Sequence, residues 1–383
     1  MKTSFWLLIF LIIYTYFFYP LLLCIFAKIF RREVKKSSRE PSVSIIVSVC
    51  DEEDVIEKKI RNLLSLDYPH DKIEILIGSD GSTDQTNDII RRCQDMRFKL
   101  IEKAERRGKM AMINELAGIA KSEIIVFTDA RQAFASDALR QLVDNFADES
   151  VGCVSGELIF RDEKSVTGKG INLYWKYEKF LRNKEAQIHS MLGATGAIYA
   201  IRRSLFKPAP GNTVLDDMFI PIKIILQGYR AAFDPSAHAY DHAAENPEEE
   251  YRRKVRTLYG NYQIFSFIPE AFNPLKSPIA LQLISHKLLR LLVPFFMIAV
   301  FIINALLMGH EPYLVIFKLQ ALFYATAISG ALLRRYKYGT LTPVAKICFI
   351  PYIFCLLNFS AFMGFFRFLT ASQEITWKKA RKS

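Results

Sequence analysis

The sequence predicts an α/β domain, doubly wound around a mixed sheet and flanked by transmembrane helices. Two observations support this fold class. Apolar runs near both ends are long enough to cross a bilayer, and the stretch between them alternates short β-branched runs with polar helical patterns. At 383 residues with 51% apolar content, the chain is too long for one ordinary domain and too apolar to be wholly soluble.

The first predicted element is a transmembrane helix at residues 4–27. No charged side chain lies between Lys2 and Lys28. A helix there would run roughly 37 Å, more than the ~30 Å hydrocarbon layer. A cleaved signal peptide is the alternative, but its apolar region would be shorter and followed by small residues, which Phe26 to Arg31 does not provide.

A single α/β domain is expected over residues 41–265, where strands and helices alternate. The predicted strands are 43–49, 73–78, 98–101 and 124–127, and the predicted helices are 52–66, 84–94 and 109–120. Each strand is a continuous apolar run, as expected when helices cover both faces of a sheet. Ligands of such sheets bind at the carboxyl ends of the strands, so functional residues are expected there.

Three more membrane helices are expected within residues 291–366. Segments 291–309 and 347–366 carry no charge, and 313–333 carries only Lys318. Before them, region 266–290 is expected to include a helix in the membrane interface, because apolar residues alternate there with basic ones. Residues 367–383 form a basic tail.

Basic residues after the first span place the middle domain on the cytoplasmic side of the cytoplasmic membrane. They are Lys28, Arg31, Arg32, Lys35, Lys36 and Arg39. The basic group at 334–337 agrees with two further crossings. If 347–366 also crosses, the basic tail lies outside, against the rule; Pro351 and Asn358 therefore leave a broken or re-entrant helix open.

The net charge of +12 indicates a membrane surface rather than nucleic acid as the partner. Much of the charge flanks membrane segments, where it can bind anionic headgroups, and no basic motif is interleaved with aromatic residues. The six cysteines have no zinc-type spacing and are interpreted as small apolar residues.

Acidic residues follow the predicted strands. Asp51-Glu52-Glu53 follows the first, Asp80 the second and Asp129 the fourth. A carboxylate at position 80 can accept from a base N–H or a ribose hydroxyl. The alternative is a turn with a helix cap, since Ser82-Thr83-Asp84 is good capping chemistry.

Taken together, these motifs resemble membrane-bound family 2 glycosyltransferases, the group of the chitin, hyaluronan and cellulose synthases. The motifs are Asp51-Glu52-Glu53, Tyr68-Pro69, Ser79 to Asp84, Arg107-Gly108-Lys109, Phe127 to Ala130, Gly193 to Ala197, Arg202-Arg203, Asp216-Asp217 and Gly228-Tyr229-Arg230. The resemblance implies a GT-A fold and inverting transfer of a hexosyl or N-acetylhexosaminyl group from a nucleotide-diphosphate sugar. It also implies a membrane-associated or lipid-linked acceptor, in cell-surface polysaccharide or glycolipid synthesis.

The same resemblance assigns donor and acceptor contacts. Asp80 is the expected partner of a uridine-type base, with Glu52 nearby. Lys109 lies where a cation approaches the donor, although a solvated helix start explains it equally well. Gly196 and Ala197 belong to the expected acceptor region.

The metal motif departs from the family. Asp129 opens a motif that normally reads Asp-x-Asp and holds a divalent cation against the diphosphate, but Arg131 occupies its second acidic position. Mg²⁺ and Mn²⁺ prefer oxygen ligands, which a guanidinium lacks. Either Asp129 binds metal with ligands such as Gln132 or His242, or Arg131 itself neutralises the diphosphate, or Arg131 simply pairs with an acid.

Asp217 is the candidate general base. It lies eleven residues before Gly228-Tyr229-Arg230, as the catalytic carboxylate does in the family. Inverting transfer needs one carboxylate to take the acceptor proton. Asp216 is the alternative base, and both residues could instead serve only to cap the helix that follows.

The segment Arg253 to Thr257 departs from the QxxRW motif of processive synthases. Arg253 stands at the Gln position, Arg256 at the Arg position and Thr257 at the Trp position. The two arginines, one helical turn apart, can meet a diphosphate or form a charged helix face. The missing aromatic platform favours addition of one or a few sugars.

Three functions therefore compete. The first is a glycosyltransferase acting on a lipid-borne acceptor, and the second is a processive polysaccharide synthase. The third is an inactive nucleotide-sugar sensor, suggested by Arg131 in the metal motif.

Overall fold

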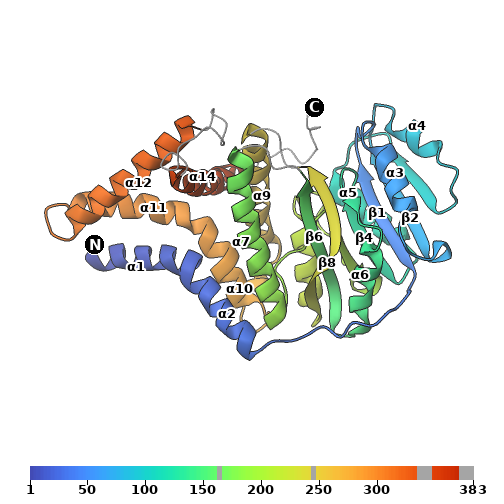
Figure 1. Ribbon diagram of the computed structural model, residues 1–383, viewed down its shortest axis with the longest axis horizontal. Coiled ribbons are helices and arrows are strands. Elements are labelled where there is room, and N and C mark those ends of the chain that lie inside the picture. The colour runs from blue at the N-terminus through green and yellow to red at the C-terminus, as the bar shows by residue number, and fades with distance from the viewer. Residues whose placement is uncertain (162–165, 243–246, 334–346, 371–383) are drawn as a thin grey trace.

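The computed structural model describes residues 1–161, 166–242, 247–333 and 347–370. The sheet occupies one side of the molecule and the long apolar helices the other (Figure 1). Two helices, α7 (Val166–Ile188) and α9 (Pro247–Phe267), lie between these parts.

Within the described residues, eight strands form one mixed sheet in the order β3-β2-β1-β4-β7-β6-β8-β5. Their bounds are Val43–Val49 (β1), Ile73–Asp80 (β2), Phe98–Lys103 (β3), Ile124–Asp129 (β4), Ala133–Phe134 (β5), Val151–Arg161 (β6), Tyr199–Arg202 (β7) and Arg230–His242 (β8). The first four strands are parallel, and β7 runs antiparallel to both β4 and β6. The α/β prediction is confirmed, and its four strands form the parallel half.

Helices cover both faces of that half. The helices of the domain's core are α3 (Ile56–Leu64), α4 (Thr86–Arg91), α5 (Lys109–Ile119), α6 (Ala138–Asp144) and α8 (Asp216–Ile225). Alternate side chains of β1 enter different clusters: Ile45 packs with Ile56 of α3, and Ile46 with Ile113 of α5. This two-sided burial explains why the predicted strands are unbroken apolar runs.

The start of α3 is later than predicted. The chain turns after β1 at Asp51, whose φ is 54°, and the backbone N–H of Glu52 donates to Thr86 Oγ1 at 2.8 Å. A backbone N–H that is bonded to a side chain in this way is held in a turn and not in a helix. The helix α3 therefore starts only at Ile56.

The strand order reverses between β1 and β4. From β1 the chain continues to β2 and β3 on one side of the sheet, and β4 lies on the other side of β1. Ligands of such sheets bind at a junction of this kind, beside the carboxyl ends of the strands. Gly78 lets α5 approach the sheet: a Cβ there would lie 2.4 Å from Met112 Sδ.

Four helices of the described chain are long and apolar enough to cross a membrane. They are Lys2–Ile29, Ala280–Leu307, α12 (Tyr313–Leu333) and Phe349–Leu369 (α14). The first consists of α1 (Lys2–Ile13), a π-helical turn (Tyr14–Phe18) and α2 (Tyr19–Ile29). The predicted membrane helices flanking the domain are thus confirmed by length and composition.

The region 266–290, expected to include a helix in the membrane interface, differs from the prediction from Ala280 onward. A 3₁₀ turn at Pro269–Phe272 is followed by α10 (Ala280–Gln282), a π-helical turn (Leu283–Leu288) and α11 (Leu289–Leu307), which form one continuous helix. Its basic residues pair with acids of α7. Because protein groups neutralise them, they can extend a span instead of lying in a separate surface helix.

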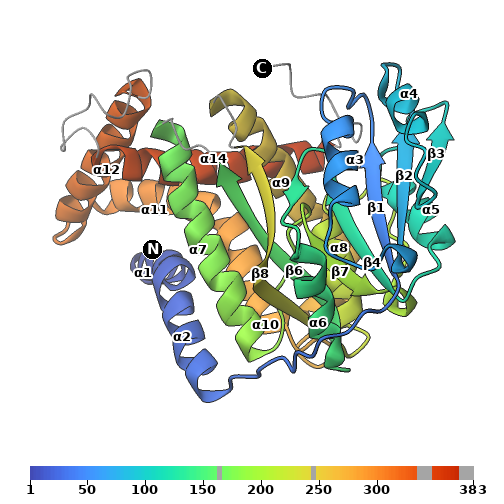
Figure 2. The same cartoon turned by 45° about the vertical axis from the view of Figure 1, so that its right-hand side comes forward.

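Residues 349–369 form an unbroken helix despite Pro351 and Asn358. Pro351 lies in the first turn, where its missing N–H costs no intrahelical bond. Asn358 Nδ2 donates to Phe354 O at 2.9 Å. In Figure 1, α1 runs across the view and α14 is foreshortened. In Figure 2, α14 runs across the view and α1 is foreshortened, so the two helices are not parallel. The helix includes Arg367, the first residue of the predicted basic tail, and residues 371–383 lie outside the described residues.

Candidate active site

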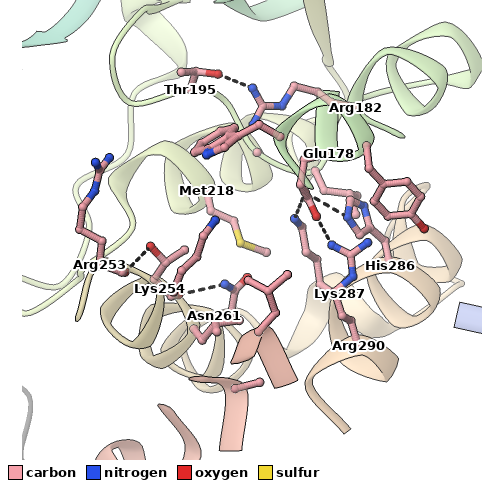
Figure 3. A pocket seen from close by; sticks show the side chains of 18 of the residues that line it. Glu178, Arg182, Thr195, Met218, Arg253, Lys254, Asn261, His286, Lys287 and Arg290 are labelled. Carbon is pink, nitrogen blue, oxygen red and sulfur yellow. Dashed lines mark hydrogen bonds and ion pairs between the residues drawn. The ribbon is translucent and has the colours of Figure 1, made fainter. Parts of the chain in front are cut away.

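A cavity of about 1000 Å³ lies between the carboxyl edge of the sheet and the membrane-side helices. Asp129 and Asp217 line it together with Gly196, Ala197 and Arg253. Figure 3 shows the part bounded by α7, α9 and the helix that begins at Ala280. Predicted residues from distant parts of the chain therefore share one cavity.

Asp217 faces this cavity from the start of α8. Its Oδ2 accepts a hydrogen bond from the Gly196 N–H at 3.1 Å, and the Ala194 N–H donates to its backbone carbonyl at 2.7 Å. A Cβ at Gly196 would lie 3.2 Å from Oδ2, so glycine allows the close approach. Burial, assisted by Asp216, raises the pKa of Asp217 to about 6. A carboxylate with such a pKa is suited to general base catalysis near neutral pH.

Lys109 links the other two acids. Its Nζ lies 2.9 Å from Asp129 Oδ1 and 3.0 Å from Asp216 Oδ1, and the Tyr199 hydroxyl donates to Asp216 Oδ2 at 3.0 Å. Both oxygens of Asp216 are thus engaged inside the protein, and Asp216 does not line the cavity. This arrangement favours Asp217 over Asp216 as the base.

Lys109 and Asp129 stabilise one another in their charged forms. Burial opposes ionisation of Lys109, but Asp129 and Asp216 outweigh it and raise the pKa of the ammonium. Burial likewise opposes ionisation of Asp129, but Lys109 outweighs it and keeps the pKa of that carboxyl below its ordinary value. An ammonium and a carboxylate therefore persist together at neutral pH.

Asp80 holds the turn before α5 in place. Its carboxylate is buried, and it accepts hydrogen bonds from the backbone N–H groups of Arg107 at 2.7 Å and Gly108 at 2.8 Å. Asp80 does not line the cavity. It fixes the turn from which Lys109 starts α5, and its contact with a nucleoside stays a prediction.

Glu52 lies in the loop after β1 and also does not line the cavity. Its neighbour Asp51 accepts hydrogen bonds from the Thr83 N–H at 2.8 Å and from Arg106 Nη2 at 3.0 Å. The loops after β1 and β2 are therefore linked to one another. These hydrogen bonds hold the loops in place where the resemblance puts the base of the donor.

Arg131 pairs with an acid, as one of the three interpretations expected. Its Nη2 lies 2.9 Å from Oδ2 of the buried Asp241, which also accepts from Gln132 Nε2 at 2.9 Å. Gln132 Oε1 is buried without a hydrogen-bond partner, and Gln132 lines the cavity with Asp129. His242 is exposed at the end of β8. This oxygen is able to accept a hydrogen bond or to bind a cation.

The two arginines of α9 have different environments. Arg253 lines the cavity, and so does Thr257 at the place of the family tryptophan. Arg256 does not line it, but lies within electrostatic reach of Asp129 and Asp217. Burial lowers the pKa of Arg256, and these carboxylates act against that effect.

Lys59 is a residue that the sequence prediction missed. Only 2% of it is exposed, and its Nζ donates to Thr128 Oγ1 at 2.8 Å and to the Gln132 carbonyl at 2.7 Å. Thr128 and Gln132 lie on either side of Asp129 in the sequence, so these two hydrogen bonds fix the loop that contains Asp129. Burial lowers the pKa of Lys59 to about 7, with Asp129 opposing the shift. The available signal was a lysine on the buried stripe of α3, between Ile56 and the later apolar positions.

Replacing Lys59 with Met should lower transfer at limiting donor about tenfold, a loss of about 1.4 kcal/mol, because the loop that contains Asp129 loses both hydrogen bonds from the ammonium. We expect the KM for donor to rise more than kcat falls, since the loop and not the base is displaced. Steady-state kinetics checks this, with Lys58→Met on the exposed face of the same helix as the control. Equal kinetic constants for the two variants would contradict a positioning role.

Comparisons with known proteins relate the chain to glycosyltransferases. Residues 44–208 match the family model "Glycosyl transferase family 2". The poly-beta-1,6-N-acetyl-D-glucosamine synthase of Staphylococcus aureus is 25% identical over 273 residues, which cover 64% of this chain and 65% of that protein. The probable glycosyltransferase YdaM of Bacillus subtilis is 25% identical over 61% of this chain and 58% of its own length. The matches thus span about three fifths to two thirds of these relatives.

A solved structure extends the likeness to nearly the whole chain. The mannosyltransferase PcManGT of Pyrobaculum calidifontis, in complex with GDP-Man and Mn²⁺, superposes with a TM-score of 0.73 at 24% identity. The match covers 97% of this chain and 100% of that one, so the GT-A fold is confirmed together with the helices that flank it. Residues 44–208 of this chain thus match the glycosyl transferase family 2 model, within a GT-A fold flanked by helices long and apolar enough to cross a membrane.

Proposed function

We propose that the protein is an inverting glycosyltransferase that moves a sugar from a nucleotide-diphosphate sugar to a lipid-linked acceptor. The main support is the cavity, which is lined both by Asp129 and Asp217 and by apolar side chains of α14. A site that joins catalytic carboxylates to membrane helices suits an acceptor held in the bilayer. Confinement to the membrane also raises the local acceptor concentration.

The chemistry needs one base and a cationic surface. The acceptor hydroxyl would attack the anomeric carbon from the side opposite the diphosphate while its proton passes to Asp217. The bond between that carbon and the diphosphate oxygen breaks, and the electron pair leaves with the nucleoside diphosphate. Lys109, which contacts Asp129, and Arg253, which lines the cavity, would stabilise the leaving charge, and Arg256 would add its field from behind them.

The residues present fit a divalent cation if the donor completes its coordination. Among the described residues no group of three or more His, Cys, Asp and Glu could hold a metal by itself. Asp129 and the unpartnered Gln132 Oε1 would supply two oxygen ligands, and diphosphate oxygens the others. When bound, Mg²⁺ or Mn²⁺ would neutralise charge on the diphosphate. The metal in the PcManGT complex supports this part of the proposal.

A processive polysaccharide synthase is the second candidate. It is favoured by the S. aureus relative, whose name describes a polymer of N-acetylglucosamine. Thr257 argues for short products, because it lines the cavity where processive members of the family have tryptophan. The length of the product therefore separates the two functions.

A donor screen tests the proposal. Purified full-length protein in nanodiscs would be incubated with UDP- and GDP-sugars and a membrane lipid extract, and released nucleoside diphosphate and product size would be measured. We expect one donor class to release nucleoside diphosphate with a lipid-soluble product of one or a few sugars. A long polymer would support the synthase, and absence of both turnover and hydrolysis with every donor would support the sensor.

The basic residues at 28–39 predict that the domain faces the cytoplasm, which protease accessibility in sealed vesicles tests.

A further inference from the structure

The helix α14 is long enough to cross a membrane, but its length does not show where its two ends lie. Its 21 residues run roughly 30 Å, about the thickness of the hydrocarbon layer. The other three long helices mark the two sides of the bilayer, so the neighbours of α14 locate both of its ends. We call the side of the GT-A domain the domain side and the opposite side the far side.

A cluster of apolar side chains marks the far side. It joins Phe5 at the start of the first helix, Leu307 at the end of α11 and Tyr313 at the start of α12. The other ends of the first two helices connect to the domain, through the segment before β1 and through Ala280. Because α12 starts in this far-side cluster and runs roughly 30 Å, its other end at Leu333 lies on the domain side.

The start of α14 lies on the domain side. Phe349 and Tyr352, in its first turn, pack with Ala331 and Leu333 at the end of α12. Among the described residues, the far-side cluster includes members of α1, α11 and α12 but none of α14. A crossing helix with this start would have to end on the far side.

The end of α14 also lies on the domain side, against α9. The ring of Tyr262 lies 5.4 Å from that of Phe365 and 5.9 Å from that of Phe368. This part of α9 is bonded to the domain, because Gln263 Nε2 donates to the Asn212 carbonyl at 2.9 Å. Both ends of α14 therefore have neighbours on the same side, which agrees with its orientation across α1 in Figures 1 and 2.

The middle of α14 connects these two ends. The ring of Phe354 lies 6.0 Å from that of Phe323, halfway along α12, so this part of α14 reaches about the middle of the bilayer. Five residues later, Phe359 stacks on Tyr251 of α9 at 6.2 Å, just before the four basic residues at 252–256. Charged side chains are costly in hydrocarbon, so α14 has left the middle of the bilayer at Phe359 and returned toward the domain.

This placement removes a conflict in the charge pattern. If α14 crossed the membrane, the four basic residues at 378–382 would follow it on the far side. Basic segments normally stay on one side of the membrane, here the side of the basic cluster at 28–39 that precedes the domain. With both ends of α14 on the domain side, the chain leaves the helix at Thr370 on the side that this rule favours.

The two faces of α14 have different surroundings. Phe359, Phe366 and Leu369 lie on one face and are exposed. On the opposite face, Phe354 and Leu357 line the active-site cavity. A helix that is apolar all round needs apolar surroundings on every side, and lipid supplies them for the exposed face.

We propose that α14 does not cross the membrane but lies in the lipid leaflet on the domain side. Phe359, Phe366 and Leu369 face the acyl chains of that leaflet, and the opposite face forms a wall of the cavity that contains Asp217. The described part of the chain then crosses the membrane three times, through the first helix, the helix that begins at Ala280, and α12. The placement follows from helix packing and does not depend on the reaction.

The first test compares the sides on which three positions lie. Three versions of the full-length protein would each carry one epitope tag: after Ser383, at His310 in the far-side connection, or at the exposed Met96 of the domain. Sealed vesicles would be treated with protease before and after permeabilisation, and the tags would be followed by immunoblot. We expect the Ser383 tag to be lost under the same conditions as the Met96 tag, and the His310 tag under the opposite conditions.

The comparison holds for either orientation of the vesicles, because each tag is judged against the other two. A Ser383 tag that is lost together with the His310 tag would show that α14 crosses the membrane and would overturn the proposal.

The second test measures depth. Phe359→Trp would be reconstituted in phosphatidylcholine brominated either near the headgroup or near the end of the acyl chain, and its added fluorescence would be compared with that of the parent protein. We expect a larger loss of emission with the shallow bromines. Ile298→Trp, at an exposed position in the middle of α11, is the matched control and should lose more emission with the deep bromines.

A crossing α14 predicts a different result, because Phe359 is its central residue and would lie at the centre of the bilayer. Quenching of Phe359→Trp in the pattern of Ile298→Trp would therefore contradict the proposal. If Phe359→Trp does not fold, the tag comparison still decides. Neither measurement uses a donor or an acceptor, so its outcome is independent of whether the protein transfers a sugar.

Discussion

Replacing Asp217 with Asn is expected to reduce sugar transfer by roughly 10²–10⁴-fold, the usual contribution of a general base. The amide keeps the size of the side chain and can still face the Gly196 loop, but it cannot take the acceptor proton. Donor binding should remain, because the carboxylate of Asp129 and the ammonium of Lys109 are untouched. Released nucleoside diphosphate measures kcat, and isothermal titration measures the Kd for donor.

Asp216→Asn is the matched control for this experiment. Asp216 is buried between Lys109 and the Tyr199 hydroxyl, so its loss should disturb the position of Lys109 more than the proton transfer. We expect a raised KM for donor with a smaller fall in kcat. The opposite pattern, with a nearly inactive Asp216→Asn and an active Asp217→Asn, would move the base to Asp216.

The pH dependence gives a second test of the base. Because the pKa of Asp217 is raised to about 6, the carboxylate is protonated and inactive below that pH and ionised above it. The rate should therefore rise about tenfold per pH unit below 6 and level off above 7. In Asp217→Asn the residual rate should lack this inflection, whereas an inflection retained near pH 6 would show that another group titrates.

Removal of divalent metal is expected to lower transfer about 100-fold or more, since a metal contributes several kcal/mol of charge stabilisation to such a transition state. The protein offers Asp129 and Gln132 Oε1 to the cation, so binding should depend on the donor diphosphate. Activity in excess chelator, followed by titration with Mn²⁺ or Mg²⁺, measures the requirement.

Gln132→Leu separates the metal hypothesis from its alternative. Loss of this ligand should raise the Mn²⁺ concentration needed for half-maximal activity about tenfold, with Gln141→Leu, on the outer side of α6, as the control. Full activity in chelator would instead assign neutralisation of the diphosphate to Lys109 and the arginines. The ion pair between Arg131 and Asp241 does not by itself decide, since Arg131 has other interactions as well.

The parallel half of the sheet was predictable because its signal is local. Strand β1 has the predicted bounds, and α5 begins at Lys109 as expected. The half formed by β5 to β8 was not predicted. In β8, buried and exposed positions alternate irregularly, and its pairing with β6 is interrupted by register shifts. Such strands are defined by partners distant in sequence, not by their own composition.

The candidate site divides in the same way. Motif order and spacing nominated Asp129 and Asp217, and the structure places both in one cavity. The same signals could not show that Asp80 binds the turn before Lys109, because capping and ligand contact use the same carboxylate chemistry. Lys59 escaped notice because a single lysine within an apolar stripe is ordinary until its buried partners are known.

The sequence by itself determined the α/β class, the membrane helices and the acidic positions at the strand ends, because hydrophobic periodicity and residue type are local properties of the chain. Only the tertiary structure decided which acids share the cavity, that Lys109 stands between Asp129 and Asp216, and that Glu178 meets Lys287 and Arg290. These contacts join residues up to 112 positions apart. Their energies depend on burial and on distances of a few ångströms, which no local pattern specifies.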